Sequence, residues 1–290
     1  MQIRPWILAA RPKTLPAALA PVILGSALAY ADGAFRAMPA ALALGFALLI
    51  QIGTNYANDY FDYVKGADTQ ERQGPARAVA SGMLSPRTML AGTLVCFAIA
   101  FAEGLCLLPY GGWPLAIVGL FCVLMGLAYT GGPFPLAYNG TADFFVLLFF
   151  GVVAVCMTYY VQAGAFTSDV FLLSLAPGAL ATNILVVNNY RDMETDRAAN
   201  KRTLVVRFGR GFGAGEYLVM LAVAHLVPLA LYLRGRGLAV LLPLLSLPLA
   251  FRLYGMMRRA DSRAAFDKAL GGTALYMIVY SLLMGVGLLV

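Results

Sequence analysis

Two short clusters of acidic side chains are the residues of this chain best suited to chemistry. Together they hold seven of the 14 Asp and Glu residues, and each cluster stands where a long apolar run ends. Several carboxylates that face one cavity repel one another, and a hard divalent cation bound through oxygen ligands relieves that repulsion. The members are Asp59, Asp62, Asp68 and Glu71 in the first cluster, and Asp192, Glu194 and Asp196 in the second.

Helical spacing separates the candidate ligands of the first cluster from its other charges. Asn55, Asp59 and Asp62 stand at i, i+4 and i+7, so a helix that continues out of the apolar run presents all three on one face. Asn58 lies beside that stripe. Gly66 is predicted to end the helix, which places the residues after it on a loop that folds back over the cluster. Those loop residues are Asp68, Glu71 and Arg72.

The second cluster repeats the arrangement. Asn188, Asp192 and Asp196 stand at i, i+4 and i+8, whereas Glu194 points elsewhere and is expected to be solvated. Magnesium prefers one or two carboxylates together with phosphate oxygens, so two opposed Asp pairs predict a site for about two or three Mg²⁺ ions around a diphosphate.

Basic residues follow each acidic cluster closely. Lys65, Arg72 and Lys201 are predicted to stabilise the negative charge that grows on a departing diphosphate, and Arg77 and Arg202 to bind the same group. The alternative is that such residues are ordinary loop charges on the cytoplasmic side of a membrane. That alternative is the better interpretation of four others, Arg207, Arg210, Arg258 and Arg259.

A diphosphate site that opens onto lipid suggests a substrate with a long hydrocarbon chain and a diphosphate head. Breaking its allylic C–O bond leaves a carbocation, which needs a dry pocket with aromatic faces. Tyr129 is the main candidate for such a face, and each tyrosine near a helix end could equally belong to an interfacial belt. Weaker candidates are Tyr56, Tyr138, Tyr159 and Tyr160.

The elements that position these residues are membrane helices. Hydrophobic residues make up 61% of the chain, charged residues 12%, and the mean hydropathy is +0.77. Apolar runs long enough to cross a hydrocarbon core of about 30 Å recur along the whole chain. We expect an all-α bundle of nine transmembrane helices, a single domain over residues 1–290, and an uncleaved first span. The runs centre near Leu24, Leu48, Ile99, Leu120, Val153, Ala179, Ala224, Leu244 and Ile278.

The distribution of positive charge predicts the orientation. With nine spans and a cytoplasmic N-terminus, 18 of the 21 Lys and Arg residues fall in cytoplasmic connections, and only Arg36, Arg234 and Arg236 fall outside. Both acidic clusters then face the cytoplasm. This topology accounts for the net charge of +7, so nucleic-acid binding is not indicated.

The cysteines and the single histidine do not indicate a second site. The four cysteines lie in or beside apolar runs without CxxC spacing, which favours a packing role. His225 lies in the middle of a span with no carboxylate near it in sequence, which favours a buried packing residue over a catalytic one.

The order of the motifs resembles the UbiA superfamily of membrane prenyltransferases. The two Asp-rich motifs are Asn55-x-x-Asn58-Asp59-x-x-Asp62 and Asn188-Asn189-Tyr190-Arg191-Asp192-x-x-x-Asp196. Finer features are similar to the branch that prenylates 1,4-dihydroxy-2-naphthoate in bacteria. They are Arg11-Pro12-Lys13-Thr14-Leu15-Pro16, Gly74-Pro75-Ala76-Arg77-Ala78-Val79 followed by Ser81-Gly82, Tyr129-Thr130-Gly131-Gly132-Pro133 and Lys201-Arg202-Thr203-Leu204.

The resemblance implies a central cavity capped by cytoplasmic loops in a bacterial inner membrane. It also implies Mg²⁺-assisted ionisation of a polyprenyl diphosphate, attack by the aromatic acceptor on C1 of the prenyl chain, and loss of the acceptor's carboxylate as CO₂. Asp59, Asp62, Asp192 and Asp196 would then hold the metal, with Asn55, Asn58 and Asn188 orienting that shell. Asp68 would touch metal or close the loop, and Arg11 and Lys13 would bind the acceptor carboxylate or anchor the helix.

Three alternatives remain open on the sequence. An ion-coupled transporter also carries intramembrane carboxylates, although usually near the midplane rather than at span ends. A CDP-alcohol phosphotransferase would use Asp and Mg²⁺, but its Asp-Gly-x-x-Ala-Arg run is absent. Within the resembled superfamily, the acceptor could instead be 4-hydroxybenzoate, homogentisate or haem.

Overall fold

A computed structural model of the protein describes residues 3–68 and 76–290. Glu71 and Arg72, which the sequence places on the loop over the first cluster, lie outside the described residues. The helical elements, in chain order, are α1 (Arg4–Ala10), η1 (Pro12–Thr14), α2 (Pro16–Ala31), α3 (Ala37–Val64), α4 (Pro86–Leu105), α5 (Leu108–Gly111), α6 (Pro114–Ala128), η2 (Leu136–Tyr138), α7 (Ala142–Leu147), η3 (Leu148–Val153), α8 (Ala154–Ala163), α9 (Ser168–Ala198), α10 (Leu204–Leu233), η4 (Leu238–Ser246), α11 (Leu247–Arg259) and α12 (Arg263–Leu289).

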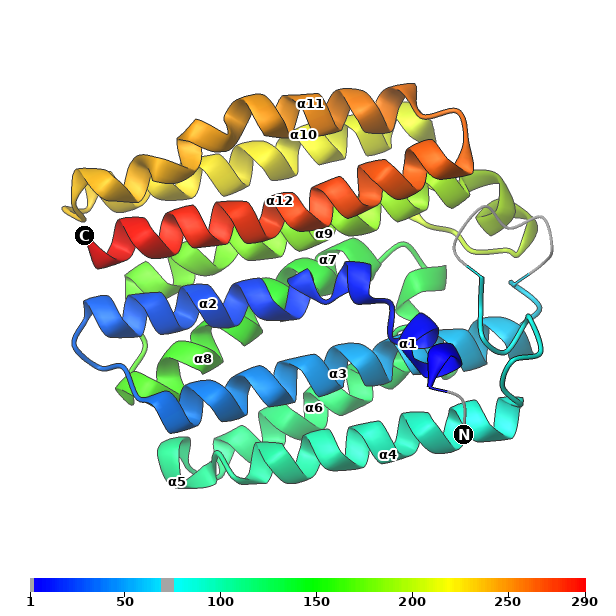
Figure 1. Ribbon diagram of the computed structural model, residues 1–290, viewed down its shortest axis with the longest axis horizontal. Helices are drawn as coiled ribbons and strands as arrows, with labels where there is room; N and C mark the ends of the chain where they lie inside the picture. The colour runs from blue at the N-terminus through cyan, green and yellow to red at the C-terminus, as the bar shows by residue number, and fades with distance from the viewer. Residues whose placement is uncertain (1–2, 69–75) are drawn as a thin grey trace.

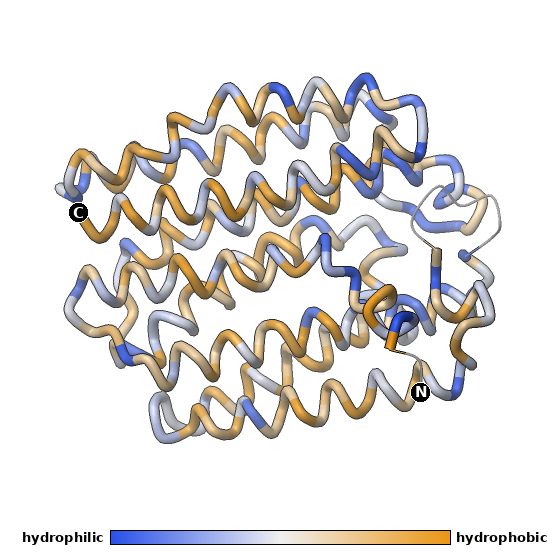
Figure 2. The backbone as a smooth tube through the Cα atoms, viewed as in Figure 1, coloured by the Kyte–Doolittle hydropathy of each residue, from blue (hydrophilic) through white to orange (hydrophobic). Residues whose placement is uncertain are grey.

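The long helices lie side by side as one bundle, and the chain runs back and forth between its two ends (Figure 1). The N-terminus lies at the end that holds α1, and the C-terminus lies at the opposite end. Hydrophilic residues gather at both ends and apolar residues dominate between them (Figure 2). The all-α membrane architecture expected from the sequence is therefore confirmed.

The predicted count of nine spans is not confirmed. Within the described residues, seven helices are long and apolar enough to cross a membrane, and the bent pair of Arg4–Thr14 and Pro16–Ala31 makes an eighth if it is one span. The remaining apolar run forms α6, which has 15 residues and so a length of about 22 Å, short of a hydrocarbon core. Even so, α6 carries the chain from one end of the bundle back to the other (Figure 1).

Helix α9 forms the centre of the bundle and contains the second acidic motif. Its close neighbour is the span α7–η3–α8, in which η3 is a π-helical turn. At their crossing, a Cβ atom on Gly151 would lie 2.7 Å from the Ser174 carbonyl oxygen, and one on Gly178 would lie 2.6 Å from the Leu147 carbonyl oxygen. Small residues thus allow the two backbones to touch, as is usual where membrane helices cross closely. The π turn directs Phe149 and Phe150 into the cavities described below.

Helix α1 and the turn η1 are fixed on the first acidic motif by hydrogen bonds. Arg11 separates them with a left-handed φ of 52°, which turns the chain sharply. The Asn55 amide donates to the Ala10 carbonyl at 2.9 Å and to the Thr14 hydroxyl at 3.2 Å, and the Gln51 amide donates to the same hydroxyl at 3.2 Å. The N-terminal segment therefore closes one side of the space above α3.

The first acidic motif ends at the predicted place. Helix α3 stops at Val64, and Gly66 takes a left-handed φ of 69°. The Gly66 and Ala67 amides donate to the carbonyls of Tyr63 and Asp62 at 3.0 and 2.8 Å, which satisfies the exposed end of the helix. Beyond the undescribed residues 69–75, the segment of residues 77–79 lies against the motif, where it contacts Asp62 and Asp59.

A network of ion pairs ties together the far end of the bundle. Arg236 contacts Asp32 at 2.8 Å and Asp169 at 2.7 Å, and Arg234 contacts Asp169 at 2.6 Å. The Tyr159 hydroxyl donates to Asp32 at 2.7 Å. The network joins the α2–α3 loop, α8, the start of α9 and the α10–η4 loop.

We expect Arg236→Gln to lower the free energy of unfolding by about 1–2 kcal/mol, because two charge-assisted hydrogen bonds are lost at a partly exposed position. Thermal unfolding in detergent measures this change. Arg234→Gln is the matched control and should cost less, since the Arg234 side chain is about twice as exposed, 48% against 25%. Equal losses in the two variants would contradict a special role for Arg236.

Candidate active site

Three adjoining cavities that share lining residues follow one another along the bundle. The head-group chamber, of about 690 Å³, is lined by Arg4, Arg11, Lys13, Asp59, Arg77, Asn188, Arg191, Arg263 and Asp267 among others. The aromatic chamber, of about 150 Å³, shares Arg11, Thr14 and Asn188 with it. The tail chamber, of about 110 Å³, is almost wholly apolar and shares Ile50, Cys122, Phe149 and Phe150 with the aromatic chamber. The lining thus changes stepwise from charged, to aromatic, to aliphatic.

Asp62 is the residue on which the cationic side chains of the site converge. One of its carboxylate oxygens accepts from the Tyr138 hydroxyl at 2.9 Å and pairs with the Lys201 ammonium at 3.1 Å. The other accepts from the Arg77 guanidinium at 3.1 Å. Lys201 follows the second acidic motif and Asp62 belongs to the first, so this contact joins the end of α3 to the segment after α9, although neither residue lines the three cavities.

Asp59 has a second role that the sequence does not indicate. Its two carboxylate oxygens accept from the backbone amides of Ala78 and Val79, both at 3.0 Å, and the side chain is 1% exposed. These bonds hold the segment that carries Arg77 over the first motif. Arg77 in turn contacts Asp68 at 3.3 Å, so Asp68 also takes part in closing this segment.

The second motif is organised around Arg191. Its guanidinium donates two hydrogen bonds of 2.7 Å to the Asp192 carboxylate and one of 3.0 Å to the Asn188 amide oxygen. It also lies 3.6 Å from the Asp267 carboxylate of α12. Asp196 interacts electrostatically with both Arg191 and Tyr138, which places it at the same site.

The donor atoms of the two motifs suit a hard divalent cation that binds together with a phosphate ligand. All the candidate groups are carboxylate or amide oxygens, as Mg²⁺ requires. No group of three His, Cys, Asp or Glu residues in the described part of the chain is arranged to hold an ion alone. Each motif therefore offers one or two carboxylates, of which Asp59 lines the head-group chamber, and phosphate oxygens would complete the coordination. Arg77, Arg191 and Lys201 compensate the same carboxylates in this structure.

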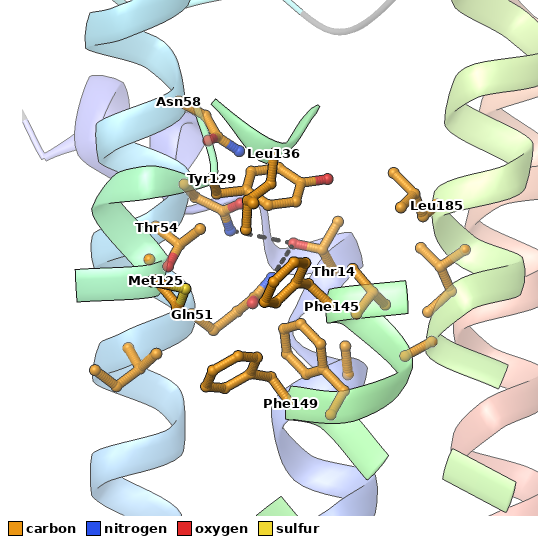
Figure 3. A pocket seen from close by; sticks show the side chains of 18 of the residues that line it. Thr14, Gln51, Thr54, Asn58, Met125, Tyr129, Leu136, Phe145, Phe149 and Leu185 are labelled. Atoms are coloured by element: carbon orange, nitrogen blue, oxygen red, sulfur yellow. Dashed lines mark hydrogen bonds between the residues drawn. The ribbon is translucent and has the colours of Figure 1, made fainter. Parts of the chain in front are cut away.

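Tyr129 lies at the boundary between charge and hydrocarbon. It follows the end of α6, and its ring extends into the aromatic chamber above Phe145 and Phe149 (Figure 3). Burial, together with the negative charge of Asp143, raises the pKa of Tyr129 well above its usual value. The phenol therefore stays neutral. Its π-face stabilises a nearby cation but does not form a bond to it, as a phenolate oxygen would.

For the prenyl transfer that the sequence resemblance implies, we expect Tyr129→Phe to stay within a few-fold of wild type and Tyr129→Leu to lower kcat by about 10–100-fold, because only the second change removes the aromatic face. Single-turnover kinetics at saturating substrates measure the difference. An equal loss in both variants would instead indicate that the hydroxyl carries the function.

Lys65 and Tyr138 complete the polar end of the site. The Lys65 ammonium donates to the Thr130 carbonyl at 2.5 Å and lies 4.5 Å from the centre of the Tyr138 ring, and Lys201 lies 4.8 Å from the same centre. Burial lowers the pKa of Lys65, with a second lowering contribution from the charge of Lys201. Burial and the Asp62 carboxylate raise the pKa of Tyr138 far above its usual value. The Thr130 hydroxyl donates to the Asn58 amide at 2.8 Å, which fixes the turn after α6 on α3.

The remaining candidates fall in different places. Arg11 and Lys13 line the head-group chamber, as the hypothesis of acceptor binding requires. The Arg202 side chain is exposed, and its backbone amide donates to the Tyr138 carbonyl at 3.0 Å. Asn55 lines the aromatic chamber while it fixes η1, and Arg72 lies outside the described residues.

Two of the weaker tyrosine candidates are far from the site. Tyr159 bonds to Asp32 at the opposite end of the bundle, and Tyr160 stacks on Phe166 at a centroid distance of 4.7 Å. Neither tyrosine lines any of the three cavities, so the structure gives no support to a cation-facing role for them. Their spacing within a span could not show at which end of the bundle they lie.

Other expectations agree with the structure. Glu194 is exposed and pairs with Arg197 at 2.8 Å. His225 is buried and contacts the Leu221 carbonyl at 2.7 Å and the Tyr276 hydroxyl at 2.8 Å, so it packs α10 against α12. The four cysteines are free.

The sequence did not identify the residues that α12 contributes. Arg263 and Asp267 line the head-group chamber, and Asp267 contacts Arg191. A usable signal existed, because the two residues stand at i and i+4 in the first turns of the last apolar run. The position of Arg191 inside the second motif was a similar signal that it belongs to the site.

The fold and the site together define a polytopic membrane protein in which a charged chamber adjoins an aromatic chamber and then an apolar one. The chain belongs to the UbiA prenyltransferase family, whose model matches residues 18–282. It is 38% identical over 277 residues to a 1,4-dihydroxy-2-naphthoate octaprenyltransferase of Mycobacterium tuberculosis, covering 96% of this chain and 94% of that protein. A protein of the same name from Escherichia coli is 39% identical over 233 residues, which are 78% of this chain and 75% of that protein.

Solved structures share the fold at low sequence identity. A UbiA homolog from Aeropyrum pernix K1 has a TM-score of 0.70 at 16% identity and covers 99% of this chain and 98% of that chain. A UbiA homolog from Archaeoglobus fulgidus, bound to DMAPP and Mg²⁺, has a TM-score of 0.67 at 16% identity, over 97% and 99% of the two chains. At this identity the likeness establishes the common fold.

Proposed function

We propose that the protein transfers a polyprenyl chain from polyprenyl diphosphate to 1,4-dihydroxy-2-naphthoate, with release of diphosphate and CO₂, as a step of menaquinone biosynthesis. The observation that carries this proposal is the graded cavity, in which the carboxylates and cations of the head-group chamber open into an aromatic chamber and then an aliphatic one. The names of the relatives from M. tuberculosis and E. coli support the choice of acceptor.

The residues at the polar end favour departure of the diphosphate. Bound Mg²⁺, held by Asp59, Asp62, Asp192 and Asp196 and completed by phosphate oxygens, would supply Lewis-acid stabilisation of the leaving group. Lys201 and Arg77 already meet at Asp62, so both lie where charge would grow on the departing oxygens. The Mg²⁺ in the A. fulgidus homolog supports the same assignment.

The dry part of the cavity protects the allylic cation that remains. Tyr129, Phe145 and Phe149 face that space, and their rings stabilise positive charge without adding to it (Figure 3). The acceptor ring attacks C1 of the prenyl chain at the carbon that bears its carboxylate. The C–C bond forms, the carboxylate leaves as CO₂, and the bonding pair returns to the aromatic ring.

The acceptor would enter through the head-group chamber. Arg11 lines both this chamber and the aromatic chamber, so its guanidinium can bind an aromatic acid at their boundary. Lys13 and Arg263 add positive charge at the same mouth. We place this mouth, and the N-terminus, on the cytoplasmic side of a bacterial inner membrane, in agreement with the distribution of Lys and Arg.

The test is turnover by the purified chain in lipid vesicles with farnesyl or longer diphosphates. We expect product and CO₂ with 1,4-dihydroxy-2-naphthoate, loss of activity with a chelator, and recovery with added Mg²⁺. Product with 4-hydroxybenzoate alone, or a prenylated naphthoate that keeps its carboxylate, would overturn the acceptor assignment. Full activity in the chelator would overturn the metal assignment.

A further inference from the structure

A second polar cavity lies outside the catalytic site, between the end of α11 and the start of α12. It has a volume of about 510 Å³, and its charged lining residues are Arg252, Arg259 and Lys268. Phe251 and Met256 line it as well, and Phe251 is 58% exposed. The cavity therefore combines three positive charges with an apolar wall, at the end of the bundle that also holds the acidic motifs (Figure 1).

The charge of this cavity is not compensated by its own lining, which contains no acidic residue. Two carboxylates adjoin it in sequence, Asp261 next to Ala260 and Asp267 next to Lys268, and Asp261 is exposed and does not line the cavity. Asp267 instead lines the head-group chamber and contacts Arg191 at 3.6 Å. An anion is thus the expected ligand of the cavity.

The helical spacing of α12 separates the two cavities cleanly. Arg263, Asp267 and Leu270 stand at i, i+4 and i+7 and line the head-group chamber. Ala265 and Lys268 lie on the opposite face and line the second cavity. The first turns of α12 therefore form a wall between the catalytic site and an anion-binding cavity.

We propose that the cavity lined by Arg252, Arg259 and Lys268 binds the phosphodiester of an anionic membrane phospholipid. The occupant is a lipid rather than a free anion, because the cavity extends along α11 from Arg259, at the end of the helix, to the exposed Phe251, about two turns further into the apolar part of the bundle where acyl chains lie. Basic pockets between membrane helices are suited to anionic head groups. The bound lipid would steady the α11–α12 connection and so hold Arg263 and Asp267 at the catalytic chamber.

The binding test uses the full chain in detergent, titrated with phosphatidylglycerol or phosphatidylcholine and followed by native mass spectrometry. We expect Arg252→Gln with Lys268→Gln to weaken binding of phosphatidylglycerol by about 10-fold or more. The matched control is Arg87→Gln with Arg258→Gln, which removes the same charge; Arg258 lies over the Tyr254 ring and does not line the cavity. Equal weakening in the two double variants would overturn the proposal.

Two further arms distinguish the source of the anion. Millimolar inorganic phosphate should not displace phosphatidylglycerol, and displacement by phosphate would identify a free-anion site instead. Binding of phosphatidylcholine as tight as that of phosphatidylglycerol would show that charge plays no part, and would equally overturn the proposal.

The activity arm rests on the proposed function. We expect wild-type prenyl transfer to be about fivefold faster in vesicles with phosphatidylglycerol than in phosphatidylcholine alone, mainly in kcat, and the cavity variant to lose this stimulation while keeping its basal rate. Stimulation retained in the cavity variant would overturn the coupling to α12. Because lipid binding is measured without substrate, failure of the proposed reaction would leave the binding result interpretable.

Discussion

Asp62→Asn is expected to lower kcat/KM for prenyl transfer by about 10³-fold, while the protein stays folded and in the membrane fraction. Asp62 is the point at which Arg77, Tyr138 and Lys201 converge from three different segments. The amide has nearly the same shape as the carboxylate but carries no charge. It can neither share a divalent cation nor hold both cations on the leaving diphosphate. Initial rates over a range of Mg²⁺ concentrations measure the effect.

Two further variants make the result specific. Glu194→Gln removes a carboxylate near the second motif that is exposed and pairs only with Arg197 among the ion pairs described, so its activity should stay within about twofold of wild type. Asp59→Asn should lose activity and also stability, by about 1–3 kcal/mol, because one of two buried backbone amides then loses its acceptor. Wild-type turnover by Asp62→Asn would contradict the assignment of Asp62 to the metal and diphosphate site.

The sequence predicts the parts of this molecule that depend on local periodicity. Helical spacing predicted that Asn55, Asp59 and Asp62 share one face, which the structure buries. The freedom of glycine to adopt a left-handed φ predicted the end of α3 before Gly66. Hydropathy located the apolar helices, because each must satisfy its own backbone hydrogen bonds in lipid. These properties are set within a few turns of a helix and need no knowledge of the neighbours.

The parts that were missed depend on contacts between distant segments. Asp59 accepts hydrogen bonds from the amides of Ala78 and Val79. This contact depends on the fold of a segment outside the motif, and the spacing of the motif carries no information about it. The contribution of Asp267 requires that α12 pack beside the second motif. The span count is not confirmed for a related reason, since a hydropathy run does not distinguish the short helix α6 or the 53° bend before α2 from a straight crossing.

Gly119→Phe is expected to change which prenyl diphosphates the protein accepts. Gly119 belongs to α6 and lines the tail chamber, where a Cβ atom would meet only the Phe46 ring, at 3.8 Å. The helix can therefore accept a side chain at this position, and the ring would project into a chamber of about 110 Å³. We expect geranyl diphosphate to be used within a few-fold of the wild-type rate, and farnesyl and longer diphosphates to lose about 100-fold in kcat/KM.

A comparison of activity with short and long prenyl diphosphates distinguishes exclusion of long chains from a general loss of activity. On the proposed function, the first isoprene units would occupy the aromatic chamber, whose lining the variant leaves intact, and later units would have to pass Ile50, Cys122 and Phe149 into the tail chamber. Leu120→Phe is the matched control, because Leu120 is the next residue of α6 but is 49% exposed on the outer surface. A uniform loss for all donors would indicate misfolding of α6. An unchanged profile would mean that the prenyl chain leaves the aromatic chamber sideways between helices, so that the lipid phase and not the tail chamber holds most of its length.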